Sequence, residues 1–236
     1  MPHDFFIGNS PAEPPALLLG IDTCGQAGSV ALGRLAGRDL EILGQVELEG
    51  RSYSATLVAA VDGLLRNTGA SLRHLRGIVV VHGPGSFTGV RVGLSAAKGL
   101  AEGAQIPVAA VSRLEVLSRK AGVPSAALDA HRGEVYLRLE AAGAASRELL
   151  AGAPELAAID PAPWRVAVCD QAALQILQKA WPAAEFPMVA APLAADALRM
   201  GEARLTAGGA ADLALLDGHY LRRSDAEIFG EPAGRP

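Results

Sequence analysis

The sequence predicts an α/β protein built as two related lobes, each with a mixed β-sheet flanked by helices. Three observations support this fold class. Hydrophobic residues make up 50% of the 236 positions, which is enough for a sizeable buried core. Three β-rich runs open the chain and are followed by a helix, a buried strand and a second helix. A new β-rich start near Ser125 then indicates that a second lobe begins.

The three opening runs predict an antiparallel meander. They span residues 16–22, 29–35 and 40–49. Gly25 and Gly28 lie in the first connection and Gly37 in the second, where glycine adopts positive φ at little steric cost. Residues 54–67 then have apolar side chains at helical spacing, and Gly69 is expected to end that helix.

The middle of the chain predicts a buried strand between helices. Residues 77–82 form a short β-branched run that is typical of a central strand covered on both faces. A helix is expected over residues 87–103 and a strand over residues 107–111. Ser112 is predicted to cap the next helix, because its hydroxyl can accept from free N–H groups and Glu115 has the capping-box spacing.

The second half is less regular. A strand, turn and strand are expected around Gly133, and later elements follow an apolar periodicity. These elements are two strands at residues 125–130 and 134–140, a strand at 164–169, and helices at 171–181 and 193–206. The predicted lobes are therefore residues 16–110 and 111–228, and a leader at 1–15 and a tail at 229–236 are expected to be disordered.

Charge and composition exclude several classes of protein. The formal net charge of −4 would not hold a nucleic-acid backbone without cations from another subunit. No signal peptide and no run of about 18 apolar residues is present, so no membrane segment is predicted. The two cysteines, Cys24 and Cys169, match neither a disulfide framework nor a zinc site. A reducing compartment, the cytoplasm, is the expected location.

A glycine-rich loop, GPGSFTG at residues 83–89, lies between a strand and a helix. Free N–H groups and the helix dipole could cradle a phosphate there. The loop lacks the Walker A lysine and the dinucleotide spacing, and a helix terminus adds only about 0.3 to 1 kcal/mol per charge. Phosphate would thus be held weakly, and the alternative is a tight turn that packs the helix on the sheet. The candidate residues are Gly83, Gly85, Ser86, Thr88 and Gly89.

Two aspartates end strands at corresponding places in the two lobes. Asp22, followed by Thr23, has the position at which actin-like ATPases place a metal-orienting carboxylate, and Asp129 would be its counterpart. Both would face one cleft; the alternative is that each caps a turn. The five histidines form no pair at helical spacing, and no serine elbow is present, so neither a metal site nor a catalytic residue is predicted.

Small residues recur every four positions along the helix after the loop. A helix face of this kind allows close backbone approach, either to a partner subunit or to the protein's own sheet. The partner interface is predicted on this face and on the apolar positions of the helix at residues 54–67. The predicted interface residues are Leu57, Val61, Leu64, Gly89, Gly93 and Ala97.

These segments together resemble the TsaB (YeaZ) family, the bacterial accessory proteins of tRNA threonylcarbamoyladenosine synthesis. The resemblance covers about residues 17–140 and, more loosely, residues 220–222, and the segment GPGSFTGVRVG is highly specific. The chain departs from the family at Tyr53, where a histidine is frequent, and at His131, where an arginine is common. The matching segments are LGIDT at 19–23, SVAL at 29–32, HGPGSFTGVRVGL at 82–94, LDA at 128–130 and RGEVY at 132–136.

The resemblance implies a two-lobed actin-like (ASKHA, RNase H-like) fold and a non-catalytic scaffold subunit. Its N-terminal lobe would pair with the catalytic paralogue TsaD, and the ATPase TsaE would complete the complex. That complex transfers threonylcarbamoyl to adenosine 37 of tRNAs reading codons that begin with A. This chain would meet tRNA only through the complex. No tightly bound cofactor is expected; ATP or ADP with magnesium in the complex, and a homodimer of the free chain, are left open.

Two other hypotheses remain. One is an independent actin-like ATPase or kinase that uses Asp22 and Asp129 with magnesium. The other is a metallopeptidase, which follows only from an old label for the wider family and lacks the histidine pair that such an enzyme needs.

Overall fold

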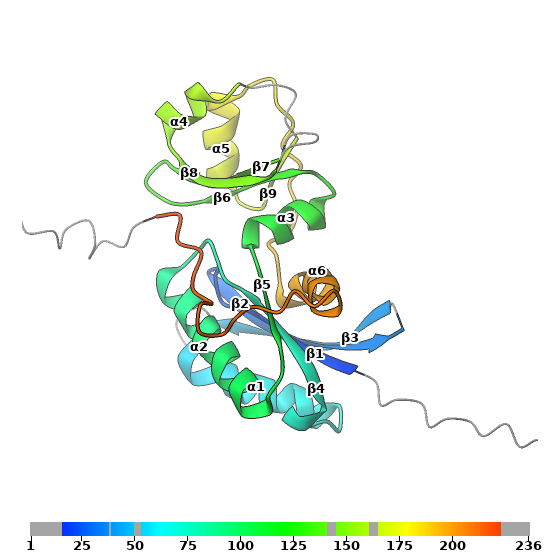
Figure 1. Ribbon diagram of the computed structural model, residues 1–236. Helices are drawn as coiled ribbons and strands as arrows, with labels where there is room; N and C mark the ends of the chain where they lie inside the picture. Colours follow the sequence, from blue (N-terminus) through cyan, green and yellow to red (C-terminus); the bar gives the residue numbers. More distant parts are fainter. Residues whose placement is uncertain (1–15, 38, 50–52, 141–144, 161–164, 223–236) are drawn as a thin grey trace, which may run out of the picture.

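The computed structural model shows two lobes, each built around its own sheet (Figure 1). The predicted leader at residues 1–15 and tail at residues 229–236 lie outside the described residues. The structure describes residues 16–37, 39–49, 53–140, 145–160 and 165–222. The predicted α/β class with two mixed sheets flanked by helices is confirmed.

The first lobe contains a five-stranded sheet in the order β3-β2-β1-β4-β5. Its strands are β1 (Ala16–Asp22), β2 (Ala27–Ala36), β3 (Asp39–Glu49), β4 (Leu75–Val81) and β5 (Val108–Val111). The first three strands form the predicted antiparallel meander, and β4 runs parallel to both β1 and β5. Strand β4 is buried on both faces, as its β-branched run predicts, because it lies between two neighbours and under helices.

Helices cover both faces of this sheet. α1 (Tyr53–Asn67) and α2 (Phe87–Ala104) lie on one face, and α6 (Ala194–Thr206) lies on the other (Figure 1). A 3-10 turn, η1 (Leu72–His74), leads into β4. Gly69, which was predicted to end α1, has φ of +68° just after that helix, and Ser86 caps the N-terminus of α2.

Helix α6 departs from the predicted lobe division. Residues 111–228 were expected to form one C-terminal lobe, yet Ala194, Ala197 and Leu198 belong to the core of the first lobe. A Cβ atom on Gly201 would lie 2.3 Å from Val79 Cγ1, so only a small residue lets α6 approach the sheet this closely. Periodicity shows that the helix has an apolar face, but not which sheet covers it.

The second lobe contains a four-stranded sheet in the order β8-β7-β6-β9. The predicted strand, turn and strand around Gly133 is the antiparallel pair β6 and β7. α3 packs on one face of the sheet, and α4 and α5 on the other (Figure 1). The elements are α3 (Arg113–Ala121), β6 (Ser125–Asp129), β7 (Val135–Leu139), β8 (Arg147–Ala151), α4 (Ala153–Ala158), β9 (Val166–Val168) and α5 (Gln171–Ala180).

Two elements of this lobe, β8 and α4, were not predicted. β8 is an edge strand whose residues are mostly half-buried or exposed, so its sequence lacks a clear alternation. α4 is a six-residue helix, shorter than the two turns that periodicity needs. Ser112 does cap α3, because its Oγ accepts from the N–H of Leu114 at 3.2 Å.

Two glycines of the first predicted turn have another role. Gly37 adopts the predicted positive φ of +66°, whereas Gly25 and Gly28 do not adopt positive φ. A Cβ on Gly25 would lie 2.3 Å from Arg113 Nη2, and a Cβ on Gly28 would lie 2.7 Å from Tyr53 Cε1. These two glycines are therefore needed for close side-chain packing rather than for backbone conformation.

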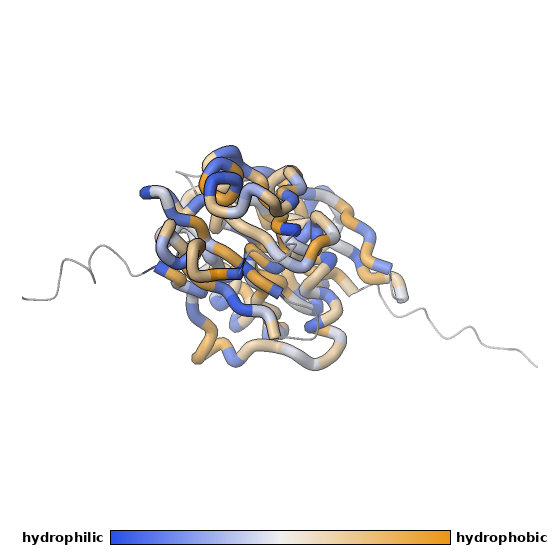
Figure 2. Tube along the Cα trace, turned by 90° about the horizontal axis from the view of Figure 1, so that it is seen from above, coloured by the Kyte–Doolittle hydropathy of each residue, from blue (hydrophilic) through white to orange (hydrophobic). Residues whose placement is uncertain are grey.

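Hydrophobic stretches cross the centre of the molecule, while hydrophilic residues recur around its outline (Figure 2). Within the ranges that the structure describes, no helix combines the length and the apolarity needed to cross a membrane.

Candidate functional site at the lobe junction

Asp22 ends β1 at the junction between the lobes and is only 1% exposed. Its Oδ1 accepts from the N–H of Cys24 at 2.8 Å, and its Oδ2 lies 3.6 Å from Arg113 Nε. The neighbouring Thr23 donates to the carbonyl of Gly89 at 2.6 Å. Both predicted site residues are therefore engaged within the chain.

Burial and charge oppose each other at this pair. Burial raises the pKa of Asp22, while Arg113 and the Cys24 N–H act to lower it. Burial acts to lower the pKa of Arg113, but Asp22, helped by Cys24, Cys169 and Tyr53, acts in the opposite direction, and together these groups raise that pKa. Arg113 stays protonated and favours the ionised form of Asp22.

Tyr53, a departure from the family pattern, packs beside this pair. Its hydroxyl donates to the carbonyl of Gly25 at 2.9 Å, and the side chain is buried. Burial raises the pKa of Tyr53 to about 12, with the Asp22 charge adding to the effect. The phenol is thus a neutral donor that holds the first connection of the meander.

The glycine-rich loop is packed against the end of β1. A Cβ on Gly85 would lie 2.2 Å from the carbonyl oxygen of Cys24, and one on Gly89 would lie 2.0 Å from that of Thr23. Both contacts are with backbone, which cannot move aside easily. The loop therefore serves as the tight turn that brings α2 onto the sheet, which is one of the two interpretations of its sequence.

The remaining loop residues form the N-terminus of α2. Gly83 has φ of +116°, a region that suits glycine, and is joined to Pro84 by a cis peptide bond. Ser86 Oγ accepts from the N–H of Gly89 at 3.2 Å. Ser86 and Thr88 are exposed, so this part of the loop is accessible to a ligand.

A cavity of about 370 Å³ opens above the loop. Gly85 and Ser86 line it, and Phe87 and Tyr220 form an aromatic wall with ring centroids 4.7 Å apart. Arg91 covers the Phe87 ring at 3.9 Å. The full lining is Pro84, Gly85, Ser86, Phe87, Ala130, His131, Arg132, Tyr136, His219, Tyr220, Leu221 and Arg222.

Asp129, at the end of β6, caps a turn. Its Oδ1 accepts from the N–H of His131 at 2.8 Å, and its Oδ2 lies 2.8 Å from His131 Nδ1. Within the described residues, Asp22 is thus paired with Arg113 and Asp129 with His131. Each aspartate has the turn-capping role that is the alternative.

An actin-like fold raises the question of a magnesium-bound nucleotide, and the residues at this junction do not fit one. Magnesium requires freely presented oxygen ligands, and the oxygens of Asp22 and Asp129 are already bound to groups of the chain. In the described part of the chain, no group of three or more His, Cys, Asp or Glu residues is arranged to hold a metal ion.

The predicted interface residues are buried inside the protein, which corrects that prediction. A Cβ on Gly93 would lie 2.3 Å from Thr23 Oγ1, so the stripe of small residues on α2 faces its own sheet. The apolar positions of α1 are buried in the same core. The residues concerned are Leu57, Val61, Leu64, Gly89, Gly93 and Ala97.

α1 and α2 line a groove that we call the outer groove, with a volume of about 300 Å³. Val58 is 60% exposed there, and Arg91 is also exposed. The outer groove is lined by Tyr53, Ser54, Leu57, Val58, Arg91, Val92, Ser95 and Ala96. The two predicted helices thus do present an accessible surface, but mainly through other residues.

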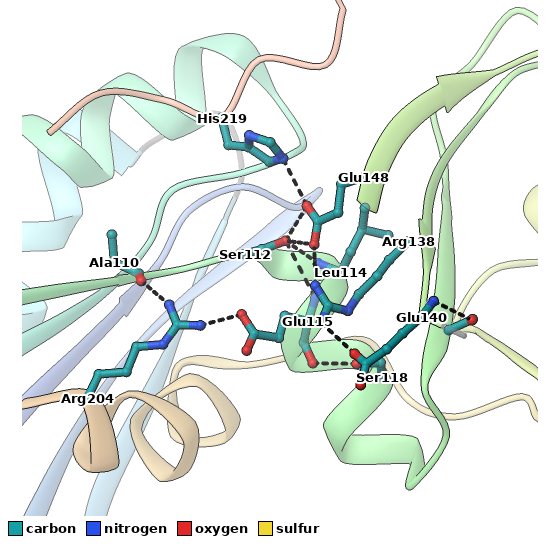
Figure 3. Close-up of polar contacts among 11 residues, drawn as sticks. Ala110, Ser112, Leu114, Glu115, Ser118, Arg138, Glu140, Glu148, Arg204 and His219 are labelled. Atoms are coloured by element: carbon teal, nitrogen blue, oxygen red, sulfur yellow. Dashed lines mark hydrogen bonds and ion pairs between the residues drawn. The ribbon is translucent and has the colours of Figure 1, made fainter. Parts of the chain in front are cut away.

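A polar network centred on Glu148 of β8 joins the lobes (Figure 3). Glu148 accepts from Ser112 Oγ at 2.7 Å and from Arg138 Nη1 at 3.1 Å, and lies 2.9 Å from His219 Nε2. Burial acts to raise the pKa of Glu148, but bonds from His219, Ser112 and Arg138 outweigh it and lower the pKa. Sequence reasoning missed this network, because Ser112 and His219 lie 36 and 71 positions from Glu148.

The segment at residues 207–222, which we call the C-terminal strap, follows α6 and returns across the first lobe to the junction (Figure 1). The N–H of Ala211 donates to the carbonyl of Val108 at 2.7 Å, and the N–H of His219 donates to that of His82 at 2.7 Å. The rings of these two histidines stack with centroids 5.4 Å apart. At its end, Arg222 pairs with Glu134 of the second lobe.

This histidine stack predicts a loss of stability on acidification. Burial lowers the pKa of His82 from its ordinary value of 6.5, and His219 adds to the effect. Below pH 6.5, His82 is therefore protonated in the unfolded chain but still neutral in the folded chain. The free energy of unfolding falls as the pH drops toward the pKa of His82 in the folded state. In that range, the free energy of unfolding should fall by up to about 1.4 kcal/mol for each pH unit. Urea unfolding between pH 7 and 5 should show this slope.

His82→Gln is the control for this pH effect, because glutamine does not titrate. The unfolding free energy of this variant should change less with pH across the same range. Glu148, with a lowered pKa, adds a separate loss only below its ordinary value of 4.5. An equal slope in the wild type and in His82→Gln would contradict the assignment to His82.

The fold and the junction together define a two-lobed, actin-like α/β protein whose central carboxylate is held by the protein's own arginine. A family model described as TsaD, tRNA N6-adenosine threonylcarbamoyltransferase, matches residues 45–214. The chain belongs to this family.

Relatives and solved structures narrow the similarity to the TsaB (YeaZ) proteins. The chain is 39% identical over 125 residues to the tRNA threonylcarbamoyladenosine biosynthesis protein TsaB of Escherichia coli K12, covering 50% of this chain and 52% of that protein. TsaB of Bacillus subtilis 168 is 38% identical over 126 residues, covering 52% and 54%. The chain spans about half the length of the curated relatives it matches.

Two solved structures from Pseudomonas aeruginosa share the fold over nearly the whole chain. One, described as similar to the peptidase YeaZ, has a TM-score of 0.72 at 27% identity and covers 88% of this chain and 100% of its own. The other, YeaZ, has a TM-score of 0.67 at 26% identity, with coverages of 87% and 100%. These matches support the resemblance that the sequence motifs indicate.

Proposed function

We propose that this chain is a non-catalytic scaffold subunit of the complex that adds threonylcarbamoyl to adenosine 37 of tRNAs reading codons that begin with A. It pairs with a TsaD-like catalytic subunit and activates it. The observation that carries the proposal is the identity of 38 to 39% to proteins named for threonylcarbamoyladenosine biosynthesis. The family match over residues 45–214 supports it.

The outer groove is the proposed surface for the TsaD-like partner. It combines an exposed valine, Val58, with the cationic Arg91 on two neighbouring helices, α1 and α2. A paralogue that shares this fold has two equivalent helices, so the four helices can pack together as a bundle. A specific interface of this kind buries about 800 Å² on each partner.

Val58→Asp is expected to abolish pairing with the TsaD-like subunit while the free chain stays folded. Val58 is already 60% exposed, so the new charge costs little before binding. In the complex it would be desolvated against apolar surface, which should weaken affinity by at least about 100-fold. Co-purification and calorimetry with the partner would measure this loss.

Met188→Asp is the matched control, since Met188 is 44% exposed and belongs to the second lobe. It should bind the partner like the wild type. Equal binding by Val58→Asp and the wild type would rule out the outer groove as the contact. A substitution at Gly93 would not test this surface, because Gly93 faces Thr23 inside the protein.

Complementation tests the function itself. Cells that lack their own TsaB should regain threonylcarbamoyl-modified tRNA when they express this chain, and nucleoside analysis of the tRNA would detect it. Absence of the modified nucleoside, with the protein present and folded, would refute the proposal. ATP hydrolysis by the chain alone at an ordinary enzymatic rate would instead favour an independent ATPase.

The remaining assignments follow from the same proposal. A TsaE-like ATPase completes the complex, tRNA is bound through the other subunits, and the work takes place in the cytoplasm. Calorimetry with ATP and ADP, on the complex and on the free chain, would locate any nucleotide site. Sedimentation of the free chain would show whether the outer groove also forms a homodimer.

A further inference from the structure

Arg113 is placed where the junction needs a positive charge. It is the first residue of α3, and its N–H donates to the carbonyl of Gly83 at 2.7 Å. Its side chain, 11% exposed, turns inward so that Nε lies 3.6 Å from Asp22 Oδ2. The carboxylate is 2% exposed at its side chain, so solvent can do little to stabilise its charge.

The guanidinium fits this space closely. A Cβ on Gly25 would lie 2.3 Å from Arg113 Nη2 and 3.0 Å from Cζ, so the first connection of the meander leaves room for the arginine only because glycine stands there. Arg113 Nε is buried and has no hydrogen-bond partner among the described residues. The group is therefore held by charge and by shape rather than by a full set of hydrogen bonds.

The contacts of this residue reach three parts of the molecule. Its backbone is bonded to the glycine-rich loop, its side chain meets the end of β1, and its helix, α3, packs on the second sheet. A cation bound between the lobes of an actin-like protein would have to reach the same carboxylate. In the structure, the Arg113 side chain occupies that place.

We infer that Arg113 is a built-in cation that takes the place of a magnesium-bound nucleotide at this junction and closes the two lobes without a ligand. This pair explains why the junction does not fit a divalent metal, because the charge of the Asp22 carboxylate is already balanced by Arg113 of the same chain. Any nucleotide used by a larger assembly must be bound by another subunit. This inference concerns the chain alone and does not rest on the proposed function.

The first test is ligand binding to the full chain. Thermal unfolding of the wild type should show the same midpoint with and without MgCl₂ and ATP, since a ligand bound only to the folded state would raise it. A clear rise in the wild-type midpoint, confirmed by calorimetric heat of binding, would overturn the inference.

The second test removes the internal charge. Arg113→Met keeps most of the side-chain volume and leaves Asp22 buried without a cation, so the midpoint should fall by on the order of 5 °C. Arg119→Met, an exposed arginine on the same helix, should leave the midpoint unchanged. An unchanged midpoint in Arg113→Met would overturn the inference.

The double variant Arg113→Met with Asp22→Asn separates charge compensation from packing. If Arg113 serves as the counter-charge of Asp22, neutralising the carboxylate should reverse most of the decrease in the midpoint temperature of unfolding. A double variant no more stable than Arg113→Met would mean that the arginine contributes packing alone, and the inference would fail. Should Arg113→Met not fold, recovery of folded protein in the double variant gives the same answer.

Discussion

Gly89→Ala is expected to destabilise the first lobe strongly, by about 3 kcal/mol or more. The added Cβ would lie 2.0 Å from the carbonyl oxygen of Thr23, a backbone atom just beyond the end of β1. Relief requires α2 to move off the sheet, which would also break the 2.6 Å bond from Thr23 Oγ1 to the Gly89 carbonyl. Urea unfolding at neutral pH would measure the change.

Gly99→Ala is the matched control on the same helix. Its Cβ would meet no described atom within 4 Å, and the position is exposed. Alanine there should stabilise the protein by roughly 0.5 to 1 kcal/mol, because it removes the entropic cost of glycine in a helix. If both variants changed stability alike, the close approach of α2 to β1 would be in doubt.

Glu148→Ala is expected to cost about 3 to 5 kcal/mol, because it breaks a buried ion pair by removing one partner. Arg138 and Glu148 are each 9% exposed at the side chain, so the buried charge of Arg138 would keep only the more exposed Glu140 as its partner. Ser112 and His219 would lose their acceptor at the same time. The contact between the two lobes and the contact of the C-terminal strap with Glu148 should therefore both loosen.

Glu140→Ala is the control for this prediction, because Glu140 pairs with the same Arg138 at 2.8 Å but is 35% exposed. Its loss should cost about 1 kcal/mol or less. Thermal unfolding would compare the two variants, and limited proteolysis would show whether the strap becomes accessible in Glu148→Ala. Similar costs for both glutamates would contradict the central role of Glu148.

Local patterns predicted most of the secondary structure. The meander of β1 to β3, the buried β4 and the Ser112 cap depend on residues close together in sequence, so periodicity and capping chemistry identified them. The edge strand β8 and the short α4 were missed because neither has a complete period.

The candidate site was predicted less well, for a related reason. The stripe of Gly89, Gly93 and Ala97 correctly indicated a face in close contact, but the contact is with Thr23 and the protein's own sheet rather than with a partner. A pattern of small residues records how near another backbone comes. It does not record whose backbone it is.

The α/β class, the meander, the glycine-rich turn and the resemblance to TsaB proteins could all be inferred from the chain's residues, because each depends on residues that are neighbours along it. The folded structure was needed to show that Arg113 pairs with Asp22, that α6 returns to the first sheet, and that Glu148 connects the C-terminal strap with both lobes. These contacts join residues that are far apart along the chain, and they exist because burial forces distant charges and apolar faces to find partners.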